Sequence, residues 1–195
     1  MNVQATVLYL HGFLSSPQSE KAQQTLRYCE QRGMVGNVLI PQMRHGPAQT
    51  MAELRAIVEV QDPATLVLIG SSLGGYYATY LAEAYALPAA LINPAVRPFE
   101  LWQEYLGPQR NYHSGEIHTV TKKHIEELRQ LHRSELQYPQ NIMPLLQTGD
   151  EVLDYTIALD KFDSSRSIVR ENGNHSYENY VDDLPAIFDF LLGRL

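Results

Sequence analysis

Short apolar runs alternate with segments of helical composition along most of this chain, and this alternation narrows the possible folds more than any other feature. The runs are TVLYL (6–10), NVLI (37–40), TLVLI (65–69), AALI (89–92), MPLLQT (143–148) and SIV (167–169). Each is apolar at odd and even positions alike, as expected of strands that are covered on both faces. Helical composition occurs at 17–32, 47–61, 74–86, 151–162 and 176–192. The alternation predicts a doubly wound α/β fold, with a mostly parallel sheet, right-handed crossovers and helices on both faces.

Two segments depart from this regular pattern. Pro144 lacks an amide N–H, so we expect its strand to begin at or just after this residue. The stretch from about 97 to 138 holds Trp102, Tyr105 and a charged run at 121–133, and it is too long for a simple crossover connection. Such a stretch is either a small lid or cap-like insertion or a set of extra surface helices. We expect one domain, 1–195, with the lid-like insertion at 97–138 inside it.

Composition excludes several classes of partner and location. A formal net charge of −7 argues against nucleic acid as a broad electrostatic partner. The single cysteine, Cys29, cannot form an intrachain disulfide, which suits a reducing compartment. The apolar run near the N-terminus ends at His11 and is too short for a signal peptide or a membrane span. We therefore expect a cytoplasmic protein without a membrane span.

The segment that carries the chemistry is GSSLG (70–74), which lies between a predicted strand and a predicted helix. It matches the G-x-S-x-G nucleophile elbow, in which Ser72, not Ser71, would be the nucleophile. The elbow holds its serine in an unfavourable backbone conformation. The residues two before and two after the serine pass so close to neighbouring backbone that a Cβ would clash, which explains the glycines Gly70 and Gly74. The alternative is an ordinary glycine-rich turn, so the assignment needs a base and an acid elsewhere in the chain.

A serine hydroxyl needs an adjacent base, and in this fold the chain order is serine, acid, histidine. Among the seven histidines, His175 alone lies beyond the last strand that could carry an acid. Asp150 follows the apolar run at 143–148, at the sheet edge where α/β folds place ligands. Glu151 and Asp154 are the competing acids. The predicted triad is Ser72, Asp150 and His175, with the aspartate orienting the imidazole.

The oxyanion of a tetrahedral intermediate also needs two amide donors. One is expected at Leu73, directly after the nucleophile, and the second at Phe13, in the loop after the first strand. An acyl pocket could be formed by Phe13, Leu14, Trp102 and Tyr105, although such side chains are as often part of a core. The residues His113, His118, His124 and His132 are spaced too widely for i, i+4 pairs on one helical face, so we expect no metal site and no cofactor.

Five blocks in the same order resemble the small YqiA-type esterases of the α/β-hydrolase superfamily. They are YLHGFLSSP, GSSLGGYYATYLA, LINPAVRPFELW, QTGDEVLDY and GNHSYENY. The resemblance extends over essentially the whole chain and implies a bacterial cytoplasmic serine esterase with a modest lid. It implies small-molecule acyl esters or acyl thioesters, such as acyl-CoA, as substrates, and it places the family's nucleophile, acid and histidine on Ser72, Asp150 and His175.

Two other kinds of function use the same fold. Peptidases, C–C hydrolases and perhydrolases also use a serine, a histidine and an acid on this fold, because the fold does not dictate the chemistry. A non-catalytic binding module could also keep the fold, but an intact serine, acid and histidine argues against that role.

Overall fold

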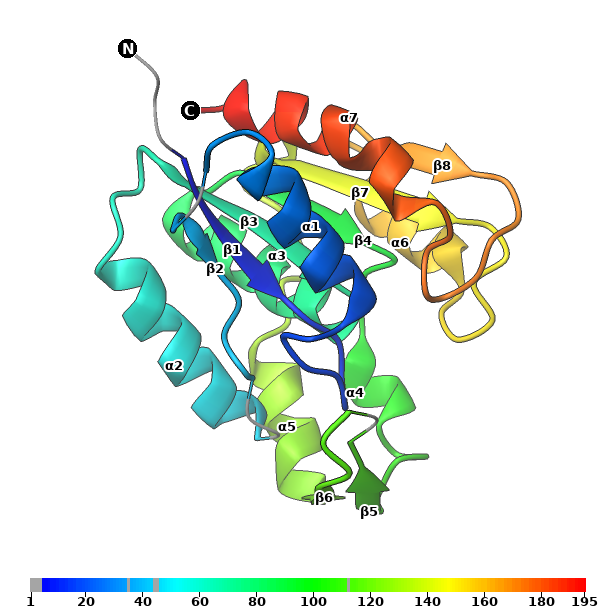
Figure 1. The fold of residues 1–195 in the computed structure, drawn as a ribbon. Coiled ribbons are helices and arrows are strands. Elements are labelled where there is room, and N and C mark those ends of the chain that lie inside the picture. The colour runs from blue at the N-terminus through cyan, green and yellow to red at the C-terminus, as the bar shows by residue number, and fades with distance from the viewer. Residues whose placement is uncertain (1–4, 35, 44–45, 112) are drawn as a thin grey trace.

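A computed structural model describes residues 5–34, 36–43, 46–111 and 113–195. Within these residues the chain forms a six-stranded sheet of order β2-β1-β3-β4-β7-β8, in which every neighbouring pair is parallel (Figure 1). The strands are β1 (Thr6–Leu10), β2 (Val38–Leu39), β3 (Leu66–Ser71), β4 (Ala89–Ile92), β7 (Ile142–Gln147) and β8 (Ile168–Arg170). All six lie within a residue or two of the predicted runs, and the predicted fold class is confirmed.

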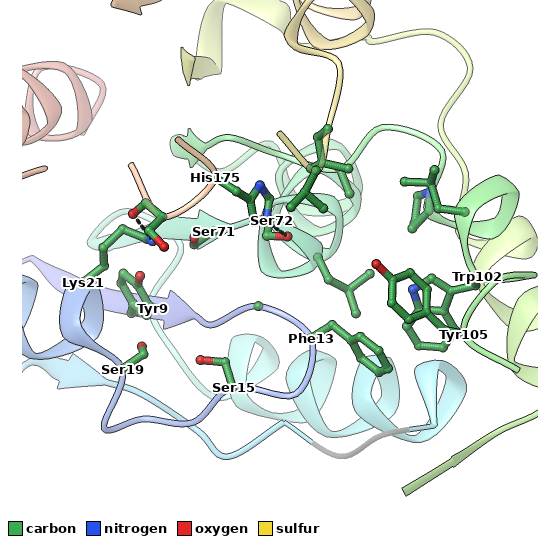
Figure 2. A pocket seen from close by; sticks show the side chains of 18 residues that line it. Tyr9, Phe13, Ser15, Ser19, Lys21, Ser71, Ser72, Trp102, Tyr105 and His175 are labelled. Atoms are coloured by element: carbon green, nitrogen blue, oxygen red, sulfur yellow. Dashed lines mark hydrogen bonds between the residues drawn. The ribbon is translucent and has the colours of Figure 1, made fainter. Parts of the chain in front are cut away.

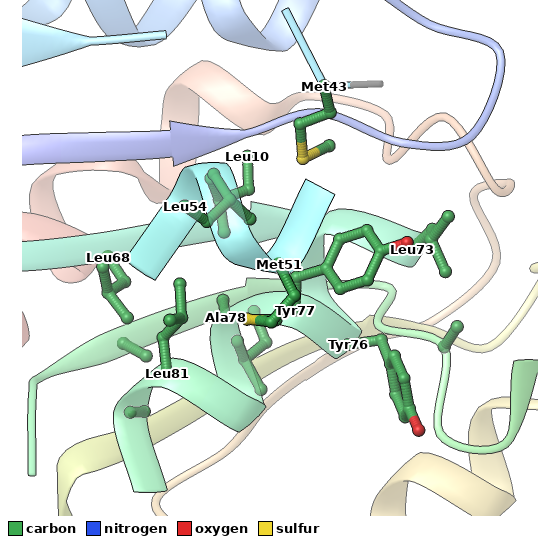
Figure 3. Close-up of a cluster of buried hydrophobic side chains, with 14 of the residues drawn as sticks. Leu10, Met43, Met51, Leu54, Leu68, Leu73, Tyr76, Tyr77, Ala78 and Leu81 are labelled. Carbon is green, nitrogen blue, oxygen red and sulfur yellow. The ribbon is translucent and has the colours of Figure 1, made fainter. Parts of the chain in front are cut away.

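Alternate residues of each strand face opposite sides of the sheet, and helices cover both sides (Figure 1). The helices between and after the strands are α1 (Glu20–Glu30), α2 (Pro47–Glu59), α3 (Leu73–Tyr85), α6 (Tyr155–Lys161) and α7 (Tyr180–Leu192). On β1, Val7 and Tyr9 pack with α1 and α7, whereas Leu8 and Leu10 pack with α2 and α3. Figure 3 shows the core on the α2 and α3 side. No helix among the described residues is long and apolar enough to cross a membrane.

The predicted insertion contains four short elements. These are α4 (Pro98–Leu101), an antiparallel hairpin of β5 (Gly107–Arg110) and β6 (Ile117–Val120), and α5 (Lys122–Gln130). Helix α5 contacts α2 and α4, and the Tyr76 hydroxyl on α3 donates a hydrogen bond to the Leu128 carbonyl (2.7 Å). The segment lies beyond the carboxyl end of β1 (Figure 1), which is the edge of the sheet where the predicted site residues gather.

A buried carboxylate fixes the point at which this segment returns to the sheet. Glu83 on α3 is 8% exposed and accepts hydrogen bonds from the amides of Gln137 (2.6 Å) and Tyr138 (3.0 Å). These amides precede the 3₁₀ turn Pro139–Asn141, which leads directly into β7. The carboxylate therefore satisfies two main-chain donors where the chain has no regular secondary structure.

The expectation that the strand begins at or after Pro144 is wrong, because β7 begins at Ile142 and runs through the proline. The Asn93 amide donates to the Leu145 carbonyl (2.8 Å), which turns Leu145 toward β4, so its neighbour Pro144 faces the β8 side. Strand β8 begins opposite Leu145. Proline is tolerated here because its missing N–H falls just before the neighbouring strand begins.

We predict that Glu83→Ala lowers the free energy of unfolding by about 2–3 kcal/mol, because two main-chain donors lose their acceptor. Urea unfolding followed by circular dichroism measures the change. Glu126→Ala is the control, since this exposed carboxylate pairs with exposed Arg129 and its loss should cost about 0.5 kcal/mol or less. Similar losses for both variants would contradict the role given to Glu83.

Candidate active site

Ser72 lies in the tight connection between β3 and α3 and has an unusual backbone conformation. Its φ is 54° and its ψ is −119°, a region that non-glycine residues seldom adopt. The Ser72 amide donates to the carbonyl of Ile92 (3.0 Å), and its own carbonyl accepts from Gly75 (2.9 Å) and Ala95 (3.1 Å). These main-chain bonds join β3, α3 and the loop after β4, and together they hold the serine in its strained conformation.

The glycines around Ser72 have no room for a side chain. A Cβ on Gly70 would overlap the carbonyl oxygen of Gly74, and a Cβ on Gly74 would overlap the backbone carbonyls at the end of β1. Gly75 is equally restricted, since its Cβ would lie 2.8 Å from the Cβ of Pro94. The structure therefore shows the close approach for which the sequence motif requires Gly70 and Gly74, and adds Gly75 to it.

The structure brings the three predicted polar residues into one hydrogen-bonded chain. His175 Nε2 lies 3.0 Å from Ser72 Oγ (Figure 2), and His175 Nδ1 lies 2.8 Å from Asp150 Oδ2. The Asp150 side chain is 2% exposed, and its Oδ1 also accepts from the amides of Val152 (2.9 Å) and Leu153 (2.8 Å). With its carboxylate held by two amides, Asp150 presents a fixed acceptor to Nδ1 of the imidazole, so that Nε2 faces the Ser72 hydroxyl.

The two competing acids have other contacts. Asp154 caps α6 by accepting from the amide (2.9 Å) and the hydroxyl (2.7 Å) of Thr156, and this hydroxyl bond is the main cause that lowers its pKa. Glu151 accepts from the main-chain amide of His175 (3.0 Å), and this bond lowers the pKa of Glu151. Asp150 is thus the carboxylate that contacts the imidazole ring, while Glu151 holds the backbone of the same histidine.

The sequence interpretation missed two buried amide side chains that anchor the His175 loop. Asn93, directly after β4, donates to the carbonyls of Asn174 (3.0 Å) and His175 (3.3 Å). Gln147, at the end of β7, accepts from the amide of Asn174 (3.1 Å) and donates to the carbonyl of Glu178 (2.8 Å). Their signal in the sequence is a polar residue at the end of an apolar run, because such positions meet at one edge of a parallel sheet.

The loop after β1 passes directly beside Ser72. A Cβ on Gly12 would lie 3.4 Å from Ser72 Cβ. Buried His11 braces this loop, since its Nε2 accepts from the Met43 amide (3.1 Å) and its Nδ1 donates to the Gly12 carbonyl (2.9 Å). In the hydrogen bonds recorded among the described residues, the amides of Phe13 and Leu73 donate to no acceptor. Both amides are therefore available to a ligand at the serine.

Ser72 and His175 open into a cavity of about 320 Å³. Phe13, Trp102 and Tyr105 form one wall, with ring centroids 4.6 Å apart for Phe13 and Trp102 and 5.9 Å apart for Phe13 and Tyr105 (Figure 2). The prediction that Leu14 lines this cavity is wrong. Leu14 has a backbone φ of 54° and is 4% exposed, and it lines another, smaller cavity with Met43 and Tyr77.

A third residue that the sequence interpretation missed is Lys21, which lines the same cavity from α1. Its ammonium donates to the carbonyl of Ser176 (2.6 Å), next to His175 in the chain. Burial lowers the pKa of Lys21 to about 8, against the opposing effects of Glu20 and Asp150. No local motif marks this residue, because its contact with Ser176 joins segments that are far apart in the sequence.

The described residues contain no group of three or more His, Cys, Asp or Glu side chains arranged to hold a metal ion. Of the four histidines considered above, His118 and His124 stack on each other with ring centroids 5.5 Å apart, and His132 lies edge-on to Phe99. These rings pack within and around the 97–138 segment.

Residues 6–192 match the model of a family described as "Uncharacterised protein family (UPF0227)". A UPF0227 protein of Shewanella sp. strain MR-4 is 24% identical over 189 residues, which cover 96% of this chain and 99% of that protein. The match spans every predicted site residue, from Phe13 to His175.

Solved structures of α/β hydrolases resemble the chain over almost its whole length. Alpha/beta hydrolase domain-containing protein 10 from mouse has a TM-score of 0.76 at 16% identity, covering 97% of this chain and 90% of that chain. Est1E from Butyrivibrio proteoclasticus, with ferulic acid bound, has a TM-score of 0.71 at 13% identity, covering 97% and 89%. At these identities the likeness concerns the fold, and it confirms the predicted α/β-hydrolase fold.

We predict that Gly74→Ala lowers the free energy of unfolding by about 2–3 kcal/mol, because the new methyl group overlaps the backbone at the end of β1. Gly46→Ala is the control, since a Cβ there meets its nearest atom at an ordinary distance of 3.8 Å and φ is negative. The control should lose about 1 kcal/mol or less. Chemical denaturation of both variants measures the difference, and an unchanged Gly74→Ala midpoint would contradict the predicted overlap.

Proposed function

We propose that this chain, which belongs to the UPF0227 (YqiA-type) family, is a serine hydrolase that cleaves carboxylic esters or acyl thioesters. The observation that carries the proposal is the hydrogen-bonded chain from Ser72 through His175 to Asp150 at the mouth of a cavity. A binding protein would not require a strained serine, an aligned imidazole and a buried carboxylate together. We place the activity in the cytoplasm, where a buried, unpaired Cys29 stays reduced.

The proposed reaction proceeds through an acyl-enzyme. Ser72 Oγ attacks the carbonyl carbon while His175 Nε2 takes its proton, and the same imidazole then protonates the departing alcohol or thiol. Water repeats the sequence on the acyl-enzyme and releases the acid. Asp150 keeps the Nδ1–H tautomer and stabilises the imidazolium, without taking the proton itself.

The oxyanion of each tetrahedral intermediate is assigned to the amides of Phe13 and Leu73. Leu73 follows Ser72 in the chain, and Phe13 follows Gly12, which passes directly beside Ser72. Among the described residues neither amide donates to a recorded acceptor. Leu73 is also the first residue of α3, so the positive end of the helix faces the developing charge. The buried Leu73 side chain packs into the core (Figure 3), which fixes the position of its amide.

The 97–138 segment is proposed as a small lid within a single domain. It supplies Trp102 and Tyr105 to the apolar wall, while Phe13 comes from the loop after β1. This wall suits the acyl group of the substrate, and it gives the segment a role beyond covering the sheet edge. Besides the ring contacts within this wall, the Asn111 side-chain amide of the segment donates a hydrogen bond to the Ser15 carbonyl in the loop after β1 (3.0 Å).

We predict that Ser72→Ala lowers hydrolysis of p-nitrophenyl butyrate to the level of the buffer, because the variant lacks the nucleophile. A fluorophosphonate probe should label the unmodified chain at Ser72, located by mass spectrometry, and should not label the variant. Ser71→Ala is the matched control, expected to retain labelling at Ser72. Hydrolysis by Ser72→Ala after removal of host esterases would refute the nucleophile, and parallel assays with thioester and peptide substrates test the reaction class.

We predict that Asp150→Asn lowers kcat/KM by about four orders of magnitude, because a neutral amide favours the wrong imidazole tautomer. Asp154→Asn is the matched control, and it should change kcat/KM by about two-fold or less because asparagine caps a helix as well as aspartate does. Steady-state kinetics with the same ester measure both variants. A larger loss for Asp154→Asn would transfer the acid role to that residue.

A further inference from the structure

One end of the active-site cavity is polar, and the mechanism proposed above makes no use of it. Lys21, Ser15, Ser19 and Ser176 line this end. In Figure 2, Lys21 and Ser19 lie to one side of Ser72, whereas Phe13, Trp102 and Tyr105 lie to the other. The reactive serine thus stands between an apolar wall and a wall that carries an ammonium group and hydroxyls.

The Lys21 ammonium has unused hydrogen-bonding capacity. A lysine ammonium carries three donors, and among the described residues its recorded acceptor is the Ser176 carbonyl (2.6 Å). The side chain is half-buried, and this burial is the main cause that lowers its pKa to about 8. Burial removes part of the water that hydrates this positive charge, so an anionic ligand that takes the place of the lost water stabilises the charged form.

The surroundings of Lys21 add further donors at the same end. Ser19 is the residue before α1, yet its side chain makes no capping bond, and the positive end of this 11-residue helix faces the cavity. The Ser15 hydroxyl also has no hydrogen bond recorded among the described residues, since Ser15 takes part through its main-chain carbonyl. An ammonium, two hydroxyls and a helix N-terminus therefore face one region.

Lys21 lies on the side where the leaving group must depart. His175 Nε2 has to protonate the leaving atom, so the leaving group extends past the imidazole. Ser176, to which Lys21 is bonded, is the next residue in the chain. In the function proposed above, the acyl group occupies the opposite, aromatic side of the cavity.

We propose that Lys21 is a specificity-determining residue that binds a carboxylate or phosphate group on the leaving group of the substrate. This inference rests on the proposed hydrolase function and narrows its substrate class to esters or thioesters whose alcohol or thiol portion carries one anionic group near the scissile bond. A neighbouring polar cavity shares Ser15, Ser19, Lys21 and Ser176 with the first and continues past them. Glu20 and Glu178 line that continuation, so a second anionic group further out is disfavoured.

A matched set of aryl esters tests this inference. The esters are 4-(butanoyloxy)benzoate, the neutral 4-(butanoyloxy)benzamide and 4-(butanoyloxy)phenyl phosphate, which share the acyl group and differ in the charge of the leaving group. The ratio of kcat/KM for each anionic ester to that for the neutral ester is measured for the unmodified chain and for Lys21→Met and Lys21→Arg. Lys123→Met removes the same charge from an 83% exposed side chain and is the control.

Lys21→Met should lower the ratio for the preferred anion by about ten-fold, the effect of one hydrogen bond to a charged group. Lys21→Arg should restore most of the ratio, and Lys123→Met should leave it unchanged. The anion with the larger Lys21-dependent ratio identifies carboxylate or phosphate as the natural group. A ratio that Lys21→Met leaves unchanged overturns the proposal. If kcat/KM falls equally for charged and neutral esters, the ratio is likewise unchanged, and Lys21 then only positions the His175 loop.

Binding without turnover separates this inference from the proposed function. In the Ser72→Ala background the three intact esters are titrated calorimetrically, with and without Lys21→Met. Tighter binding of an anionic ester that disappears with Lys21→Met supports the anion site, even if the unmodified chain hydrolyses none of the three. Equal affinity for charged and neutral esters overturns it, even if hydrolysis is observed.

Discussion

The strained backbone of Ser72 is the constraint on which the rest of the site depends. A non-glycine residue with φ of 54° costs on the order of 1–3 kcal/mol, and it persists only where its surroundings leave no alternative. Here β4, α3 and the loop after β4 all hydrogen-bond to the main chain of this one residue, and three glycines remove the side chains that would push these elements apart. The elbow is therefore a product of close packing across the centre of the sheet.

Around the elbow, buried polar side chains hold the loops in place by hydrogen bonds to their main chain. Asn93 and Gln147 bind the His175 loop, Asp150 binds the turn that follows it, and Glu83 binds the return of the 97–138 segment. Asn93, Gln147 and Glu83 join segments that are distant in sequence, and each of the four side chains satisfies donors or acceptors where no helix or strand does so. The loops that carry the chemistry are thus fixed to the rigid sheet by directional bonds, whereas the exposed ion pairs on the helices contribute little.

The sequence predicts those features that depend on local pattern. Apolar runs locate the strands, and the elbow glycines identify Ser72 because both signals arise from neighbours in the chain. The predictions for Pro144 and Leu14 are wrong because each depends on contacts that are not local. Strand β8 begins opposite Leu145, which allows β7 to run through Pro144, and the positive φ of Leu14 turns its side chain into the core. Lys21 has no local signal at all, because its meaning comes from a contact with Ser176 across the fold.

The placement of Lys21 also explains how an acidic protein could select an anionic substrate. A net charge of −7 repels anions at long range, so steering by the surface field cannot favour them. Beyond a Debye length of about 8 Å, salt screens exposed charges at physiological ionic strength, but it screens a half-buried contact far less. Discrimination then arises only once the leaving group is inside the cavity, next to the imidazole that must protonate it. An anion bound there also fixes the orientation of the scissile bond, so recognition and positioning come from the same contact.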